Sequence, residues 1–310
     1  MSATKNQPIF IIGCPRSGTT LLRRLFDAHS QISCPGESFV LRGAARFLAS
    51  ERVAEGIDYG PLGALSSLGF GRDEITARLG RMVLSFHEDI AKAEDKPRAA
   101  LKTAVDSFYL PEIHDIFGDQ AKYLCLVRHG ADVAMSLRDF SEKMEGFIDE
   151  LLPFVQSHRR LLPAFGAAWA KVTADMLDLA EAFGDHVFAF HYEDLVAEPR
   201  EVLQELFDFV EAPCDIDNLL ADAFRPKEVR GLGDYKTFTT TGIETSSVGR
   251  WEGLSDRIKA ELAPILNPTL ARAGYAEIET HWSGTDDGMR RHELAMMYQA
   301  SRRPEGGDDR

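Results

Sequence analysis

The sequence predicts an α/β fold, because short apolar runs alternate with segments that have helical spacing. Three runs have the length and composition of buried strands, and they occupy residues 9–12, 122–127 and 186–191. Apolar residues recur at helical spacing after the first run, in residues 21–26. After the third run, Pro199 is placed to open a helix.

The first strand, Ile9–Ile12, continues into a glycine-rich loop and then into a helix. The loop is the sequence GCPRSGTT, residues 13–20. Glycines let the backbone approach an anion closely, and the free N–H groups and dipole of a helix start favour negative charge. This layout predicts a phosphate-binding loop.

The loop differs from a nucleoside triphosphate P-loop at one position. Gly13 and Gly18 hold the glycine positions of G-x-x-x-x-G-K-[ST], and Thr20 holds the hydroxyl position. Thr19 stands in place of the lysine that reaches the β- and γ-phosphates. A cation is present instead at Arg16, which suits a donor with a charged terminal group and no metal.

The motif PRSGTT after a strand resembles the 5′-phosphosulfate loop of sulfotransferases that use PAPS (3′-phosphoadenosine 5′-phosphosulfate). The resemblance covers about residues 9–275 and is to the glycan-type and tyrosylprotein-type branch, as a soluble member of bacterial style. It implies a three-layer, P-loop-like α/β fold with a central, mostly parallel sheet flanked by helices. The loop residues that it implies in donor binding are Arg16, Ser17, Gly18, Thr19 and Thr20.

Glu37 follows Pro35 and Gly36, shortly after the first predicted helix. From its charge alone, it suits either the N-terminus of the next helix or a general base near the phosphate-binding loop. In glycan-type and tyrosylprotein-type sulfotransferases, a glutamate about one helix beyond the loop takes the proton of the acceptor. Glu37 matches that position.

Lys102 lies in a short predicted strand with a polar end, residues 98–105, where a lysine is usually solvated. The resemblance implies instead that Lys102 contacts the bridging oxygen and the sulfonate of the donor. Cytosolic small-molecule sulfotransferases often have Lys-Thr-His here, with the histidine as base. Ala104 replaces that histidine, which moves the base role to Glu37.

The strand at residues 122–127 runs into Arg128, and Ser136 follows eight residues later in the next helix. A cation and a hydroxyl are thus expected at the carboxyl end of a strand, where open α/β sheets bind ligands. The pattern resembles the 3′-phosphate motif of the family, R-x-P-x-D-x-x-x-S, with Asp132 matching and Gly130 in place of the proline. It implies that Arg128 and Ser136 bind the donor.

Two later segments resemble nucleotide-binding landmarks of the family. Tyr192 opens the sequence YEDL after the third strand, and the family tyrosine commonly lies against the adenine; a packing or capping role is the alternative. Gly249 and Arg250 resemble a C-terminal loop in which a glycine N–H and an arginine hold the 3′-phosphate. Trp251 is expected to pack that loop onto the core.

Length and composition favour a single domain over residues 1–280, with a helical insertion at about 40–95 and a polar tail at 281–310. Fading periodicity and several glycines predict a mobile loop or lid at 225–247. The last helix, 255–273, contains two prolines and is expected to kink or break.

The net charge of −14 argues against non-specific binding to nucleic acid or to an anionic membrane surface. The four cysteines form no CxxC pair, so neither a disulfide framework nor a zinc site is expected. The chain shows no apolar signal region and no run of about 18 apolar residues, which predicts a cytoplasmic protein without a membrane anchor.

The implied reaction is transfer of a sulfonate group from PAPS to an acceptor hydroxyl without a metal, leaving PAP. In it, Glu37 takes the acceptor proton, while Arg16 and Lys102 neutralise charge on the sulfonate and the leaving oxygen. The expected acceptor is a small molecule, natural product, glycan or lipid. Two other classes stay open, namely a P-loop-type kinase of a small metabolite and a catalytically silent nucleotide-binding module.

Overall fold

The computed structural model describes residues 7–49, 51–53, 57–225 and 242–282. Most of the predicted lid and most of the predicted tail lie outside the described residues.

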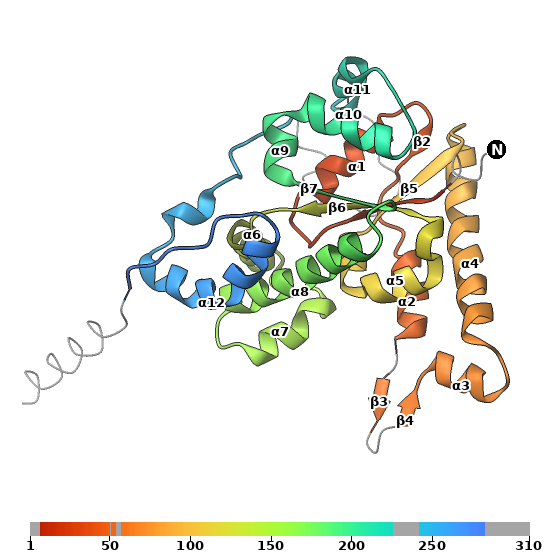
Figure 1. Cartoon of the computed structure of the whole chain (residues 1–310), viewed down its shortest axis with the longest axis horizontal. Coiled ribbons are helices and arrows are strands. Elements are labelled where there is room, and N and C mark those ends of the chain that lie inside the picture. The colour runs from red at the N-terminus through yellow and green to blue at the C-terminus, as the bar shows by residue number, and fades with distance from the viewer. Residues whose placement is uncertain (1–6, 50, 54–56, 226–241, 283–310) are drawn as a thin grey trace, which may run out of the picture.

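In the described part of the chain, five parallel strands form the central sheet, in the order β2-β5-β1-β6-β7. Ile11 lies beside Lys102 of one neighbouring strand and beside Leu124 of the other. The predicted parallel α/β sheet is confirmed (Figure 1). The strands are β1 (Ile9–Ile12), β2 (Ile32–Ser33), β5 (Arg98–Lys102), β6 (Lys122–Val127) and β7 (Val187–His191).

Helices cover both faces of the sheet and complete the three predicted layers (Figure 1). Successive residues of β1 alternate between two cores, because side chains of a strand point to opposite faces: Ile9 and Ile11 join one core, Phe10 and Ile12 the other. One face is covered by α1 (Thr19–Asp27), α9 (Tyr192–Ala197), α10 (Pro199–Phe209) and α11 (Ile216–Ala223). The other is covered by α2 (Val40–Leu48), α4 (Arg72–Ala93), α5 (Leu110–Phe117), α6 (Gly130–Met144), α8 (Leu161–Ala182) and α12 (Asp256–Arg272).

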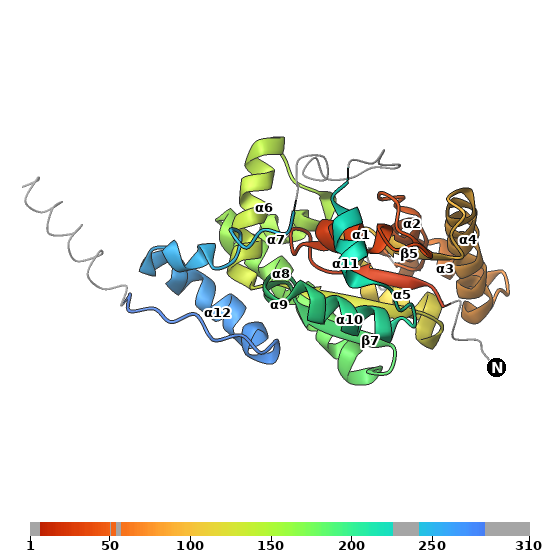
Figure 2. The same cartoon turned by 90° about the horizontal axis from the view of Figure 1, so that it is seen from above.

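The predicted helical insertion contains a hairpin that the sequence did not indicate. In it, β3 (Glu51–Val53) pairs antiparallel with β4 (Ile57–Tyr59), before α3 (Pro61–Ser67) leads to α4. The hairpin lies apart from the central sheet, and α4 and α12 lie at opposite ends of the molecule (Figures 1 and 2). The remaining connections include α7 (Leu152–Ser157) and the short turns η2 (Ala104–Tyr109), η3 (Gly118–Gln120), η4 (Asp149–Leu151) and η6 (Arg250–Gly253).

Two element boundaries differ from the sequence prediction. The strand predicted for residues 98–105 ends at Lys102, because the chain turns into η2 at Ala104. The predicted break in the last helix is absent, since α12 is continuous through Pro264 and Pro268. Tertiary packing explains this continuity: α12 buries a leucine at every fourth position in the core, which offsets the lost backbone hydrogen bonds.

The order of the strands reverses at β1. The chain leaves β1 through α1 to reach β2 and β5 on one side, and later reaches β6 and β7 on the other side. In open α/β sheets, ligands bind outside the carboxyl ends of the strands at such a switch point. The fold therefore gathers the glycine-rich loop after β1, Lys102 at the end of β5 and Arg128 after β6 at one edge of the sheet.

Gly130 begins α6 against the indole ring of Trp169. A Cβ atom at Gly130 would lie 2.6 Å from Trp169 Cε3. Trp169 is fully buried, and its Nε1 donates a hydrogen bond to the carbonyl oxygen of Arg128 at 2.9 Å. The indole therefore explains the glycine in place of the proline of the motif, because the ring fills the space of a side chain and fixes the backbone at Arg128.

Replacement of Gly130 with alanine is expected to lower the free energy of unfolding by about 1–3 kcal/mol, because Trp169 has to shift in a packed core. Gly43→Ala is the matched control. Gly43 lies in α2, and a Cβ atom there would have no neighbour within 4 Å, so the higher helix propensity of alanine is expected to stabilise by about 0.5–1 kcal/mol. Urea denaturation measures the free energy of unfolding of both variants. Equal changes in the two variants would contradict the role of Trp169.

Candidate functional site

A cleft of about 750 Å³ opens where the ends of β1, β5 and β6 meet. Its lining joins the glycine-rich loop to segments that lie far away in the sequence. Two predicted site residues, Ser17 and Gly249, are not part of the lining. The predicted site residues that line the cleft are Arg16, Gly18, Thr19, Thr20, Glu37, Lys102, Arg128, Ser136, Tyr192 and Arg250.

The glycine-rich loop presents the start of α1 to this cleft. Gly18 has a φ of +100°, and a Cβ atom there would lie 2.4 Å from Tyr192 Cδ2, so both the backbone and the Tyr192 ring require glycine. The helix begins at Thr19 without a side-chain cap, and the first N–H groups of a helix have no partner within it. The loop therefore offers N–H donors and the positive end of a helix dipole to an anion.

Ser17 belongs to the loop but is buried, with 1% of its surface exposed. Its N–H donates to the carbonyl oxygen of Cys14 at 3.0 Å, while its Oγ is buried and has no hydrogen-bond partner among the described residues. Any contribution of Ser17 to ligand binding therefore acts through the conformation of the loop, which its N–H helps to hold.

Arg16 connects the glycine-rich loop to α6. Its φ of 76° is unusual for a residue other than glycine, and such strained backbones concentrate at functional sites. Arg16 Nε donates to Ser136 Oγ at 3.5 Å, and its guanidinium lies 5.0 Å from the centre of the Phe140 ring. The predicted cation and the predicted hydroxyl thus lie side by side.

Glu37 and Lys102 form an ion pair at the cleft. Lys102 Nζ donates to Glu37 Oε1 at 2.6 Å and to Thr20 Oγ1 at 3.5 Å. The ammonium side chain is buried, whereas the carboxylate is partly exposed. The predicted base, the predicted lysine and a hydroxyl of the glycine-rich loop therefore form one chain of contacts, although Glu37 and Lys102 are 65 residues apart.

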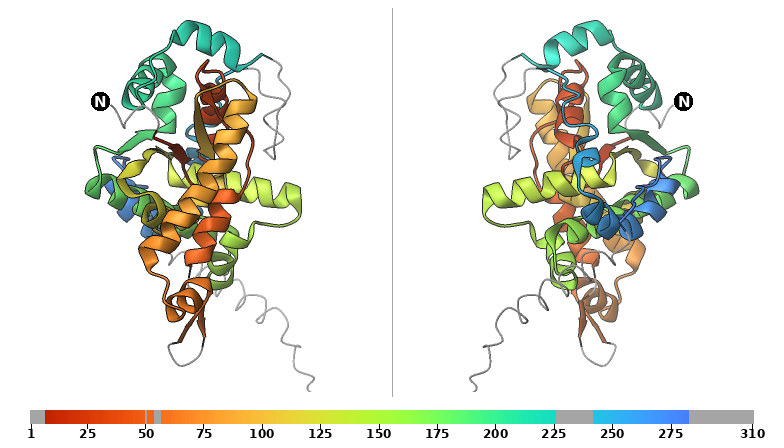
Figure 3. Two further views of the ribbon diagram at one scale, coloured as in Figure 1. Left: turned by 90° about the vertical axis from the view of Figure 1, so that its right-hand side faces the viewer. Right: turned by 90° about the vertical axis from the view of Figure 1, so that its left-hand side faces the viewer.

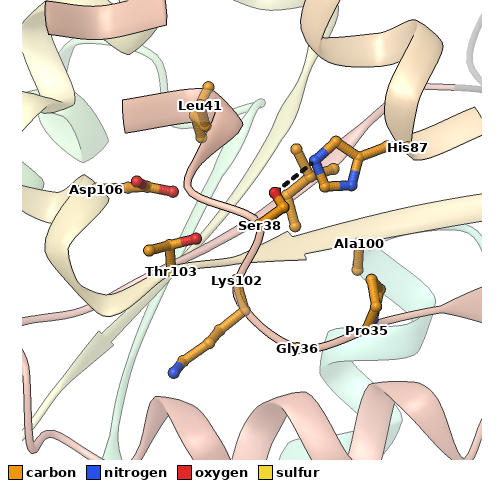
Figure 4. A pocket seen from close by; sticks show the side chains of 10 residues that line it. Pro35, Gly36, Ser38, Leu41, His87, Ala100, Lys102, Thr103 and Asp106 are labelled. Atoms are coloured by element: carbon orange, nitrogen blue, oxygen red, sulfur yellow. Dashed lines mark hydrogen bonds between the residues drawn. The ribbon is translucent and has the colours of Figure 1, made fainter. Parts of the chain in front are cut away.

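A small polar pocket lies beside Lys102 (Figure 4). In it, Ser38 Oγ and His87 Nε2 are 3.3 Å apart, which ties the residue after Glu37 to α4. Burial lowers the pKa of His87 to about 4, and burial raises the pKa of Asp106 well above its ordinary value. Lys102 extends away from this pocket (Figure 4), so its ammonium group meets Glu37 in the larger cleft.

Arg128 connects the two loops that border the cleft. Its Nη1 donates to the carbonyl oxygen of Arg16 at 3.1 Å, and its Nη2 donates to the carbonyl oxygen of Ser247. The guanidinium lies over the Tyr192 ring, 4.7 Å from its centre, and Tyr192 Oη is 3.0 Å from Ser247 Oγ. Tyr192 thus packs on both Gly18 and Arg128 in this structure.

Asp132 holds the C-terminal loop in place. Its carboxylate accepts hydrogen bonds from the N–H of Gly249 at 2.8 Å and from the N–H of Trp251 at 2.9 Å. The Gly249 N–H that was predicted to hold a phosphate is therefore engaged with Asp132 here. Arg250 donates to Asp139 at 2.8 Å at the edge of the cleft.

The expected packing of Trp251 is confirmed. Its ring packs against the core and is stacked on His129, with ring centres 4.4 Å apart and an interplanar angle of 7°. Burial first, and the nearby charge of Arg128 second, lower the pKa of His129 to about 4. Glu193 completes this support, because its Oε1 accepts from the His129 N–H and its Oε2 accepts from Tyr275 Oη.

Sequence reasoning missed several residues that line the cleft. Arg24 follows Thr20 by one helical turn, and Phe140 follows Ser136 by one helical turn, so helical spacing from a predicted residue was the available signal. Phe39 lies two residues beyond Glu37 and has a φ of 57°. No sequence signal indicated that backbone conformation.

Within the part of the chain that the structure describes, no group of three or more His, Cys, Asp and Glu side chains is arranged to hold a metal ion. No described helix has both the length and the apolar character needed to cross a membrane. The expected cytoplasmic location stays a prediction.

The fold and the cleft define an α/β protein with an anion-binding, P-loop-like turn at the switch point of its sheet. The sulfotransferase family matches the chain over residues 8–216. The chain belongs to the sulfotransferase family and is an enzyme of that class, as the sequence resemblance predicted. Membership of this family counts against the two alternative classes, a P-loop-type kinase of a small metabolite and a catalytically silent nucleotide-binding module.

The chain is also similar in sequence to individual curated proteins. Protein-tyrosine sulfotransferase A of Caenorhabditis elegans is 27% identical over 276 residues, which are 86% of this chain and 67% of that protein. The nodulation protein NoeE of Sinorhizobium fredii is 24% identical over 257 residues, which are 78% of this chain and 59% of that protein.

Solved structures agree on the fold. The sulfotransferase domain from the curacin biosynthetic pathway superposes with a TM-score of 0.61 at 20% identity, over 88% of this chain and 99% of that domain. The sulfotransferase domain of the Synechococcus PCC 7002 olefin synthase superposes with a TM-score of 0.59 at 22% identity, over 87% of this chain and 96% of that domain. At these identities the likeness concerns the fold.

The stacked His129 gives stability a defined pH dependence. In the unfolded chain histidine titrates near 6.5, whereas folded His129 stays neutral down to about pH 4. The unfolded state therefore binds the proton first, and stability falls as the pH drops below about 6.5. His129→Phe keeps a flat ring against Trp251 and removes this titration.

Between about pH 7.5 and pH 5, the wild type is expected to lose about 2 kcal/mol of unfolding free energy relative to His129→Phe. Urea denaturation of both proteins at each pH measures the difference. Parallel pH profiles would contradict the buried, neutral state of His129.

Proposed function

We propose that this sulfotransferase moves a sulfonate group from PAPS to a hydroxyl of a small-molecule, natural-product, glycan or lipid acceptor, giving PAP. The observation that supports this best is the chain of contacts from Glu37 through Lys102 to Thr20. It places a carboxylate, an ammonium group and the start of an anion-binding helix within one cleft. This is the set of groups that transfer of an anionic group to a hydroxyl requires.

The residues present fit a donor with two separate phosphate positions. Gly18 permits the backbone turn, with φ +100°, that leads into α1, and the uncapped start of α1 suits the 5′-phosphate, with Thr19 and Thr20 beside it. Arg128 directly follows β6 and Ser136 lies in α6, and both line the cleft and suit the 3′-phosphate. Arg128 Nε supports this assignment, because it is buried and has no hydrogen-bond partner among the described residues.

The proposed reaction is an in-line displacement. The acceptor oxygen forms a bond to sulfur while the bond between sulfur and the bridging oxygen of the 5′-phosphate breaks, and that oxygen keeps the electron pair. Glu37 accepts the proton of the acceptor hydroxyl. Lys102 and Arg16 stabilise the charge that builds on the bridging oxygen and the sulfonate oxygens.

Donor binding is tested by calorimetric titration of the full chain with PAP in EDTA, with ATP as the matched nucleotide. The proposal expects saturable PAP binding without metal and much weaker ATP binding, because Thr19 replaces the lysine that a triphosphate requires. Magnesium-dependent ATP binding with no PAP binding would refute the donor assignment.

The base assignment is tested by Glu37→Gln, which keeps the shape of the side chain and removes its basicity. Turnover with radiolabelled PAPS is expected to fall by about 10²–10⁴-fold, the typical contribution of general-base catalysis, with PAP affinity unchanged. Glu88→Gln, at an exposed position of α4, is the matched control and should leave turnover unchanged. Wild-type turnover in Glu37→Gln would assign the base elsewhere.

A further inference from the structure

We infer that the acceptor is an uncharged hydroxyl compound with an apolar body, and that this body lies along α6 in the same cleft. This inference rests on the proposed function and narrows its acceptor from the four classes above. It depends on how polar and apolar side chains are distributed along the cleft.

The face of α6 that lines the cleft changes from polar to apolar along its length. Ser136, Phe140 and Met144 are spaced by four residues, so they lie on one face of the helix, and all of them line the cleft. Ser136 contacts Arg16 at the donor end. Phe140 and Met144 follow towards the C-terminal end of α6, which projects from the molecule (Figure 3), although the Phe140 ring still lies 5.0 Å from the Arg16 guanidinium.

Apolar residues outside α6 also line the cleft. Two of them are Phe39, from the segment that carries Glu37, and Val105, from the segment that follows Lys102. Ile148 and Leu151 continue the wall after the end of α6. A hydroxyl that reaches Glu37 is therefore attached to a body that lies against apolar side chains.

Among the described residues, two cations near this wall, Arg42 and Arg46, are already paired. Arg42 and Arg46 both contact Glu150 Oε1, at 3.3 Å and 2.8 Å, and the Glu150 side chain is buried. Arg42 also covers the Phe39 ring at 4.9 Å from its centre. These pairs fix the wall around Phe39 and leave it poorly suited to an acidic peptide, which requires unpaired cations.

Along α6 and the segment after it, Ser136 and Ser141 are the described polar residues that line the cleft. Ser141 lines it, is 5% exposed, and has an Oγ without a hydrogen-bond partner among the described residues. A glycan needs several hydrogen bonds to replace those that its hydroxyls lose from water, because unpaired buried polar groups are costly. One serine suits a single additional oxygen on an otherwise apolar acceptor.

The test measures sulfonate transfer from radiolabelled PAPS by the full chain to four acceptors: octanol, cyclohexanol, N-acetylglucosamine and a tyrosine peptide flanked by aspartates. Calorimetric titration of the PAP complex with the same compounds measures their binding. The inference expects kcat/KM for the two apolar alcohols to exceed the other two by at least about tenfold, and saturable binding of the apolar alcohols alone.

Met144→Asp is the diagnostic variant, with Phe147→Asp as the matched control. Both side chains are exposed, at 59% and 38%, but only Met144 lines the cleft. Met144→Asp is expected to raise KM for octanol about tenfold, since a charged group replaces apolar contact, with PAP affinity unchanged. Phe147→Asp should change neither quantity.

The outcomes separate the two proposals. If PAP does not bind to the wild-type protein, the proposed function is refuted. Intact PAP binding with transfer confined to the sugar or the peptide would overturn only the apolar acceptor, as would the absence of both transfer to and binding of the apolar alcohols. Equal effects of Met144→Asp and Phe147→Asp would overturn the placement along α6.

Discussion

The parallel pairing of β1 with β5 on one side and β6 on the other is the constraint on which the whole site depends. It brings three strand ends to one edge and joins residues that are distant in sequence. Because Ile11 and Lys102 are in register, the lysine reaches the loop that follows β1 and meets Glu37 there. A one-residue slip would turn Lys102 to the opposite face of the sheet and separate the ion pair.

The cleft is cationic in a chain whose net charge is −14. Arg16, Lys102 and Arg128 come together there because the sheet places their strand ends side by side, and two of these side chains are buried. Burial lowers the effective dielectric constant around a charge, so a few cations have a strong effect on an anionic ligand. The charge of the whole chain governs its behaviour in solution and does not describe the site.

The sequence located most strands of the sheet and most of the cleft, the strands from local apolar patterns and much of the cleft from motifs that resemble the sulfotransferase family. Apolar runs located β1, β6 and β7, and the loop chemistry located Arg16 to Thr20. The two-residue strand β2 and the hairpin of β3 and β4 were too short to give a periodic signal. Contacts made by the fold were also invisible: nothing in the sequence shows that Asp132 binds the N–H of Gly249, or that Arg128 bridges two backbone carbonyls.

A crystal structure of the full chain with PAP tests the central claim most directly, because that claim concerns where the two phosphates lie. We expect the 5′-phosphate within hydrogen-bonding distance of the N–H groups of Gly18 to Thr20 and the 3′-phosphate beside Arg128 and Ser136. We also expect the nucleotide to leave the space along Phe140 and Met144 unoccupied. PAP bound along α6, or outside the cleft, would contradict both the assignment of the donor site and the inference that the acceptor lies along α6.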